Sequence, residues 1–161
     1  MPPDDDRSNY GMARDALLDR VSQPPRVHRI RGELDPAVAA AQYERELGDT
    51  RLDLVLLGLG PDGHVASLFP GAPTLEERER RVVAAEAGHE PFVARITLTL
   101  PVLCSGRSVL FLVTGEAKAE AARAAFAAEP SAQTPGSLVR ARDGGTVALL
   151  DRAAASSLSR S

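Results

Sequence analysis

The chain has 161 residues, of which 43% are hydrophobic and 25% are charged, and its formal net charge is -3. This length allows one domain with its own core, and the composition is ordinary for a globular protein. The weak negative charge and the 4% content of aromatic residues exclude a basic or base-stacking surface for nucleic acid. No apolar run approaches the roughly 18 residues that span a bilayer. We therefore expect neither nucleic acid nor a membrane as a partner.

Cysteine usage bears on the compartment. Cys104 is the only cysteine, so the chain cannot form an internal disulfide, which fits a reducing cytosol. The acidic start from Met1 to Asp6 contains no apolar segment and does not look like a signal peptide. These features predict a cytoplasmic location.

Lys118 is the only lysine among 19 basic residues, so it is either a chance survivor or a site that needs a compact ammonium group.

The first third of the chain predicts two helices and a short strand. Ser8 is a suitable N-cap for a helix over residues 8–21, whose apolar side chains share one face. The alternation at residues 27–30 predicts a strand. Asp35-Pro36 opens a second helix, because proline is favoured at the first helical position, and a glycine ends it.

The rest of the chain predicts a parallel sheet. Residues 52–59 and 108–114 are almost entirely apolar and bounded by turn residues, which is typical of strands covered on both faces. The second of these leads into an alanine-rich helix at residues 116–128. Shorter strands are predicted at residues 82–85, 96–100 and 145–150. Strands that alternate with helices favour an α/β fold, with helix, sheet and helix layers and a mostly parallel, Rossmann-like sheet.

The strongest candidate for a functional site follows the first apolar strand, in the run Gly58-Leu59-Gly60-Pro61-Asp62-Gly63-His64. Ligands of open α/β sheets bind beyond the carboxyl ends of strands, and glycines there let the backbone approach a ligand closely. A helix beginning near Asp62 would direct its N–H groups at an anion. Asp62 and His64 are two residues apart on this turn, so both can face one pocket. A carboxylate that orients an imidazole is typical of hydrolytic general-base chemistry.

The same residues permit other interpretations. The glycine spacing that begins at Gly58 also fits the dinucleotide-binding fingerprint, with Glu86 near the acidic position about 20 residues further on. A nicotinamide-dependent oxidoreductase is therefore one alternative. Asp62 alone could be a helix N-cap, and His64 alone could be a structural turn histidine.

The run from Gly58 to Gly71 resembles the signature of the 6-phosphogluconolactonases, which share their fold with the glucosamine-6-phosphate deaminases. The deaminases are similar through Asp62-Gly63-His64, whereas the segment from Ala66 to Gly71 is lactonase-like. Further segments resemble the lactonases in the same order along the chain: residues 6–12, 52–60, 95–99, 113–119 and 150–154. Several motifs that lie far apart in the sequence therefore point to the same family.

The resemblance implies hydrolysis of 6-phospho-D-glucono-1,5-lactone to 6-phosphogluconate in the pentose phosphate pathway, with a small sugar-phosphate lactone as partner and no cofactor or metal. His64 would be the general base that activates water, and Asp62 its partner. Gly60 and Gly63 would contribute to substrate binding through close backbone approach. By the same resemblance, Lys118 and Arg95 would contact the 6-phosphate; alternatively, Arg95 would only end its strand at the surface.

The resemblance also implies that the chain corresponds to the C-terminal two-thirds of the family domain. Family members begin with a strand, a Gly-Gly-Ser-Thr-Pro loop and a second strand that ends in Asp-Glu-Arg. We expect that Met1 stands where a longer reading frame encodes Val, and that open sheet edges promote self-association. Residues 1–155 would form one α/β domain, with a disordered tail at residues 156–161. A non-catalytic sugar-phosphate-binding fragment is therefore a further alternative.

Overall fold

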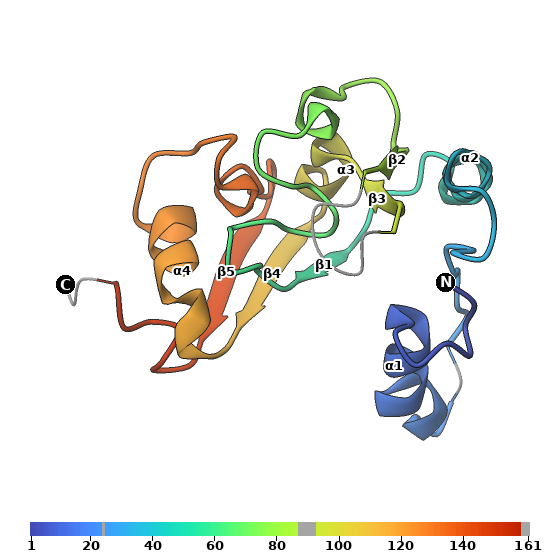
Figure 1. The fold of residues 1–161 in the computed structure, drawn as a ribbon, viewed down its shortest axis with the longest axis horizontal. Coiled ribbons are helices and arrows are strands. Elements are labelled where there is room, and N and C mark those ends of the chain that lie inside the picture. Colours follow the sequence, from blue (N-terminus) through green and yellow to red (C-terminus); the bar gives the residue numbers. More distant parts are fainter. Residues whose placement is uncertain (24, 87–92, 159–161) are drawn as a thin grey trace.

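The centre of the fold is a parallel sheet of three strands in the order β1-β4-β5 (Figure 1). The structure is a computed structural model that describes residues 1–23, 25–86 and 93–158. The three strands are β1 (Leu54–Leu57), β4 (Ser108–Val113) and β5 (Gly145–Leu150). Leu54 lies opposite Ser108, which lies opposite Gly145, so the strands start at one level and their carboxyl ends share one edge. The predicted α/β class and mostly parallel sheet are confirmed.

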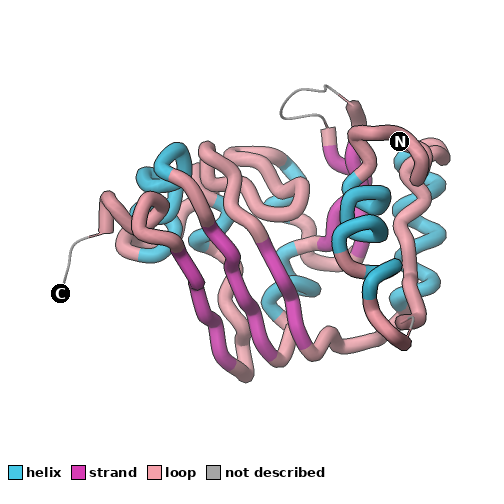
Figure 2. The backbone as a smooth tube through the Cα atoms, turned by 90° about the horizontal axis from the view of Figure 1, so that it is seen from below, coloured by secondary structure: helices cyan, strands magenta, loops and turns pink. Residues whose placement is uncertain are grey.

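A second sheet and the helices surround this centre. The strands β2 (Val82–Ala85) and β3 (Arg95–Leu98) form a separate antiparallel pair. The α-helices are α1 (Asn9–Ala16), α2 (Pro36–Leu47), α3 (Leu100–Cys104) and α4 (Ala119–Phe126), and the 3-10 helices are η1 (Leu18–Arg20), η2 (Pro73–Glu76), η3 (Glu116–Lys118) and η4 (Pro135–Ser137). Figure 2 shows the three parallel strands side by side, with α1 and α2 beyond the β1 side of the sheet. Among the described residues, no helix has the length and apolar character needed to cross a membrane.

Local capping signals account for the start of both N-terminal helices. The Ser8 side chain accepts a hydrogen bond from the backbone N–H of Gly11 at 3.1 Å, as expected of an N-cap. Asp35 accepts from the backbone N–H groups of the second and third residues of α2, and Pro36 occupies its first position. Gly48 ends α2 with a φ of 48°, which few other residues adopt. The predicted starts of both helices and the predicted end of α2 are confirmed.

Other predicted elements differ from the structure. The helix expected over residues 8–21 ends at Ala16 and continues only as η1, and residues 27–30 form no strand. The strand expected over residues 96–100 ends at Leu98, because α3 begins at Leu100 with Pro101 in its first turn, where proline is favoured. The helix expected over residues 116–128 is divided into η3 and α4.

The core lies against one face of the parallel sheet. Val55 and Leu57 of β1 are buried with Val109, Phe111 and Val113 of β4, and Ala122 and Ala125 of α4 pack in the same cluster. The side chains that alternate with them project from the other face and are about half exposed: Leu54, Leu56, Leu112, Val147 and Leu149. The expectation that residues 52–59 and 108–114 are covered on both faces is therefore wrong for the described part of the chain. The division into a domain of residues 1–155 and a tail stays a prediction, and residues 159–161 of that tail lie outside the described residues.

Candidate active site

The turn after β1 brings Asp62 and His64 into direct contact. Nδ1 of His64 lies 2.6 Å from Oδ1 of Asp62, and the backbone N–H of His64 donates to the same oxygen at 3.2 Å. One carboxylate oxygen therefore holds both the ring and the main chain of His64. Each side chain is 25% exposed, so the pair is partly shielded from water and still reachable by a small molecule.

Two glycines allow this turn to close. The N–H of Gly60 donates to the carbonyl of His64 at 2.8 Å, and the N–H of Gly63 donates to the carbonyl of Gly60 at 3.0 Å. Gly63 has a φ of 85°, a conformation that residues with a side chain rarely adopt. At Gly60 a Cβ would overlap the His64 ring. The loop at residues 58–72 contains turns and no helix, so no helix N-terminus near Asp62 directs its N–H groups at the site.

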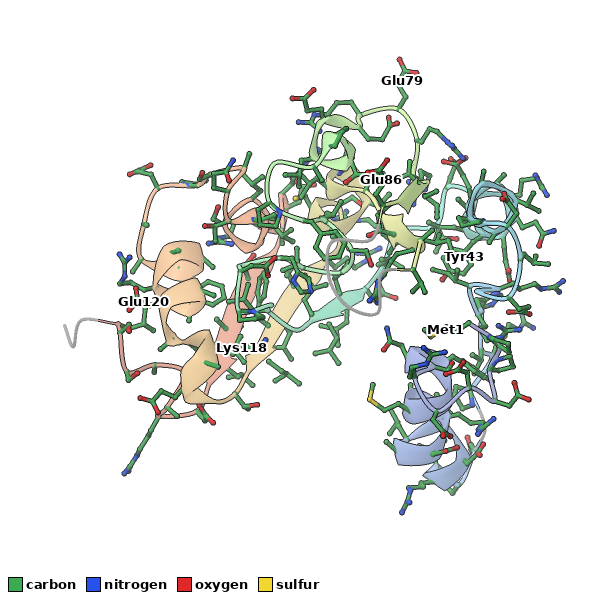
Figure 3. All side chains as sticks on the ribbon, in the orientation of Figure 1. Met1, Tyr43, Glu79, Glu86, Lys118 and Glu120 are labelled. Carbon is green, nitrogen blue, oxygen red and sulfur yellow. The ribbon has the colours of Figure 1, made fainter. Side chains whose placement is uncertain are left out.

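His64 lines a cavity of about 750 Å³ that is also lined by the residues of β1. Gly60 and Lys118 line the same cavity, as do Asn9 and Met12 of α1. Lys118 ends η3, which follows β4, so it lies beyond the carboxyl end of the strand that neighbours β1 (Figure 3). No carboxylate among the described residues forms an ion pair with Lys118. The cavity therefore combines a histidine–carboxylate pair with an ammonium group available to an anion.

Arg95 is not brought into this cavity. It lines a neighbouring cavity of about 380 Å³ together with Ser67 and Arg7. Its Nε is buried and has no hydrogen-bond partner in the described part of the chain. Asn9 lines both cavities. The backbone N–H of Ser67 donates to Thr97 Oγ1 at 3.2 Å, which ties the site loop to the strand that carries Arg95.

Two residues near the pair were not assigned a role from the sequence. The Phe69 ring is 9% exposed, and its centroid lies 5.0 Å from that of His64 at an interplanar angle of 46°. It therefore supports the imidazole from within the loop. Asn9 belongs to a segment that resembles the lactonases, and this was the available signal, but nothing local placed it beside His64. Its position depends on how α1 lies relative to β1.

The dinucleotide interpretation does not fit the geometry. The acidic residue of that motif follows the next strand of the same parallel sheet, and a helix begins at the glycines. Glu86 instead follows β2, which pairs antiparallel with β3 outside the parallel sheet, and it is exposed. Within the described ranges, no group of three His, Cys, Asp or Glu side chains is arranged to hold a metal ion.

The fold and the site define an α/β protein that places a histidine–carboxylate pair and a lysine in one cavity at the carboxyl edge of its parallel sheet. The family model described as glucosamine-6-phosphate isomerases/6-phosphogluconolactonase matches residues 1–148. The chain belongs to this family.

Similar proteins within the family are named as lactonases. The 6-phosphogluconolactonases of Rattus norvegicus and Streptomyces coelicolor are 42% and 40% identical to the chain, over 99% and 100% of its length. The solved 6-phosphogluconolactonase of Thermotoga maritima has a TM-score of 0.80 over 94% of the chain, at 31% identity. The chain spans 65% of the rat protein, 67% of the Streptomyces protein and 68% of the Thermotoga chain. It therefore covers about two thirds of the length of these relatives.

Proposed function

We propose that the chain carries the hydrolytic site of a 6-phosphogluconolactonase, which adds water to 6-phospho-D-glucono-1,5-lactone and releases 6-phosphogluconate. The observation that carries this proposal is the 2.6 Å contact between Asp62 and His64 in a cavity that also contains Lys118. The named relatives support the choice of lactone over other small anionic ligands.

The geometry supports a general-base mechanism. Asp62 engages Nδ1 of His64, so Nε2 takes a proton from water while the water oxygen bonds to the lactone carbonyl carbon. The resulting tetrahedral intermediate breaks its bond to the ring oxygen, and this oxygen receives the proton back from the imidazolium. One water is consumed, and the new carboxylic acid ionises. Asp62 stabilises the imidazolium and fixes the ring, a kind of assistance that contributes about 10²–10⁴-fold to rate.

Phosphate recognition is assigned to basic groups around the pair. Lys118 shares the cavity with His64 and would bind the 6-phosphate directly. Arg95 would make a second contact from the neighbouring cavity, which meets the first at Asn9. Gly60 and Gly63 would let the substrate approach the backbone of the turn. Metals and cofactors have no part in this proposal.

Substitution of His64 by Ala tests the proposal. We expect the rate of lactone opening, measured by coupling to 6-phosphogluconate oxidation and corrected for spontaneous hydrolysis, to fall by about 10²–10⁴-fold. His28→Ala is a matched control, because His28 also contacts a carboxylate, Glu46, at 2.6 Å, but both side chains are nearly half exposed at the surface. A His64→Ala protein with wild-type turnover would refute the assignment.

A chain without turnover favours the non-catalytic alternative. In that case, calorimetry with 6-phosphogluconate decides between a sugar-phosphate-binding fragment and a protein that does not bind this ligand at all.

The proposed compartment is the cytoplasm, supported by the single thiol of Cys104, which is partly buried and donates to the carbonyl of Leu138 at 3.5 Å.

We also propose that the chain self-associates through the open β1 edge of its sheet and the apolar face beside it. Leu56, Leu110 and Val147 lie side by side in register on neighbouring strands, and no described strand pairs with the outer edge of β1. Because an unpaired strand edge can pair with a second copy and the exposed side chains beside it are apolar, association at β1 removes both from water. Sedimentation velocity should show a dimer or larger species that Leu56→Lys shifts toward monomer. A monomeric wild-type chain at micromolar concentration would contradict the proposal.

A further inference from the structure

Arg140 has an environment that the proposed chemistry does not explain. Its guanidinium is half-buried and donates to three main-chain carbonyls: Ala125 at 2.6 Å, Val139 at 2.8 Å and Gly136 at 3.0 Å. It also lies 5.7 Å from the centroid of the Phe126 ring. No carboxylate in the described ranges forms an ion pair with it. Burial lowers the pKa of Arg140, yet a guanidinium keeps its charge in proteins. The buried charge is therefore stabilised by oriented carbonyls.

These contacts join two elements on the side of the site away from β1. Ala125 lies in the last turn of α4, where helix carbonyls lack partners within the helix and a cation is favoured. Gly136 lies in η4. One side chain therefore holds η4 against the C-terminal end of α4, whose N-terminal end follows Lys118.

The turn η4 in turn contacts the active-site loop. The backbone N–H of Gly136 donates to the carbonyl of Gly63 at 2.9 Å. The approach is close, because a Cβ at position 136 would lie 2.6 Å from Leu59 Cδ1, and one at position 63 would lie 2.8 Å from Thr134 Cγ2. A displacement of η4 would therefore be transmitted to the peptide between Gly63 and His64.

This peptide is where the connection reaches the catalytic pair. The carbonyl of Gly63 and the N–H of His64 belong to one planar unit, so they cannot rotate independently. Gly136 holds the carbonyl end, and the N–H end donates to Asp62 Oδ1 at 3.2 Å. The same oxygen contacts the His64 ring at 2.6 Å. The orientation of the peptide thus helps to fix the carboxylate that orients the imidazole.

We propose that Arg140 is a positioning residue for the Asp62–His64 pair, acting through the carbonyl of Gly136. The kinetic part of this inference rests on the proposed lactonase function, whereas the structural part does not. Loss of the guanidinium leaves three inward-facing carbonyls without this donor, and the η4 turn then loses its attachment to α4. The site loop keeps its fold but no longer holds the pair in one arrangement.

The kinetic test compares three variants of the full chain. We expect Arg140→Gln to lower kcat about tenfold while KM changes less than about twofold, because the pair acts on the reacting bond and not on phosphate binding. Arg140→Lys should recover part of the loss, since an ammonium can still donate to carbonyls. Arg123→Gln is the matched control, because Arg123 lies on α4 but is 51% exposed and pairs with Glu120. Equal kcat values for Arg140→Gln and wild type would overturn the proposal.

A spectroscopic readout decides the inference even if the chain turns over no lactone. In ¹⁵N NMR the His64 ring of the wild type should show one tautomer with a proton on Nδ1, and Arg140→Gln should show a mixture. Exchange of the His64 amide hydrogen should become at least about tenfold faster. Wild-type tautomer and exchange in Arg140→Gln refute the role of Arg140. If Arg140→Gln shows the expected changes but the wild-type chain does not turn over lactone, only the lactonase proposal is refuted. If Arg140→Gln does not fold, Arg140→Met takes its place, because it keeps an apolar stem but has no donor for the carbonyls, and wild-type exchange and tautomer in Arg140→Met count against the proposal.

Discussion

Replacing Gly60 by Ala would test the geometry of the pair without removing any functional group. A Cβ at this position would overlap Nδ1 and Cε1 of His64 and lie 2.5 Å from Oδ1 of Asp62. Gly60 is not one of the glycines with positive φ, so alanine suits the backbone there. The collision with the Asp62–His64 pair is therefore the main perturbation.

The expected fall in kcat follows from the contact that the His64 ring loses. The overlap cannot persist, so the imidazole must turn away and lose its 2.6 Å contact with Asp62. Losing oriented general-base assistance costs about 10²–10⁴-fold in kcat, equivalent to roughly 3–5 kcal/mol in the activation barrier. Stability should change less, by about 1–3 kcal/mol, which is the usual range for an extra carbon in a packed site. The His64 side chain is 25% exposed and can move outward, so we expect the loss of stability to lie near the lower end, about 1 kcal/mol.

Gly58→Ala is the matched control in the same loop, because a Cβ there has no atom within 4 Å and Gly58 also lacks a positive φ. Both variants would be compared for kcat on the lactone and for thermal unfolding. Gly58→Ala should match the wild type in both. If Gly60→Ala keeps kcat within about threefold of wild type, the Asp62–His64 contact is not used in the reaction and the proposed mechanism fails.

Two further expectations concern the phosphate and the α2 packing. Lys118→Ala should raise KM and weaken inhibition by inorganic phosphate with kcat nearly unchanged, because phosphate contacts are equal in ground and transition states; a fall in kcat at constant KM would contradict this. Burial by itself raises the pKa of Glu44, but hydrogen bonds from the backbone N–H groups of Arg81 and Val82 and from the Arg80 side chain outweigh it, so this pKa lies below its usual 4.5. The stability that Glu44 contributes is therefore present above its unfolded-state pKa and is lost as the pH falls through the lowered folded-state pKa. Thermal midpoints from about pH 7 to pH 3 should fall less steeply in Glu44→Gln than in the wild type, and parallel curves would count against the assignment.

Features that depend on neighbouring residues could be predicted from the sequence. Ser8 and Asp35 cap helices because their side chains reach backbone N–H groups two or three residues away. Asp62 and His64 meet because a turn places residues two apart on one side. The apolar runs of β1 and β4 indicate strands for a similar reason, since hydrophobicity and chain stiffness are local properties.

The tertiary structure decided which surfaces these elements share. Leu54 and Leu56 are as apolar as Val55 and Leu57, yet they are exposed, because a pattern of apolar residues does not state whether a partner covers each face.

Lys118 and His64 are far apart in sequence and line the same cavity because β1 and β4 are parallel neighbours with a common carboxyl edge. Arg140 joins η4 to α4 through main-chain carbonyls. Every residue has such a carbonyl, so an acceptor of this kind leaves no mark in the sequence, and only the folded arrangement shows which one a side chain uses.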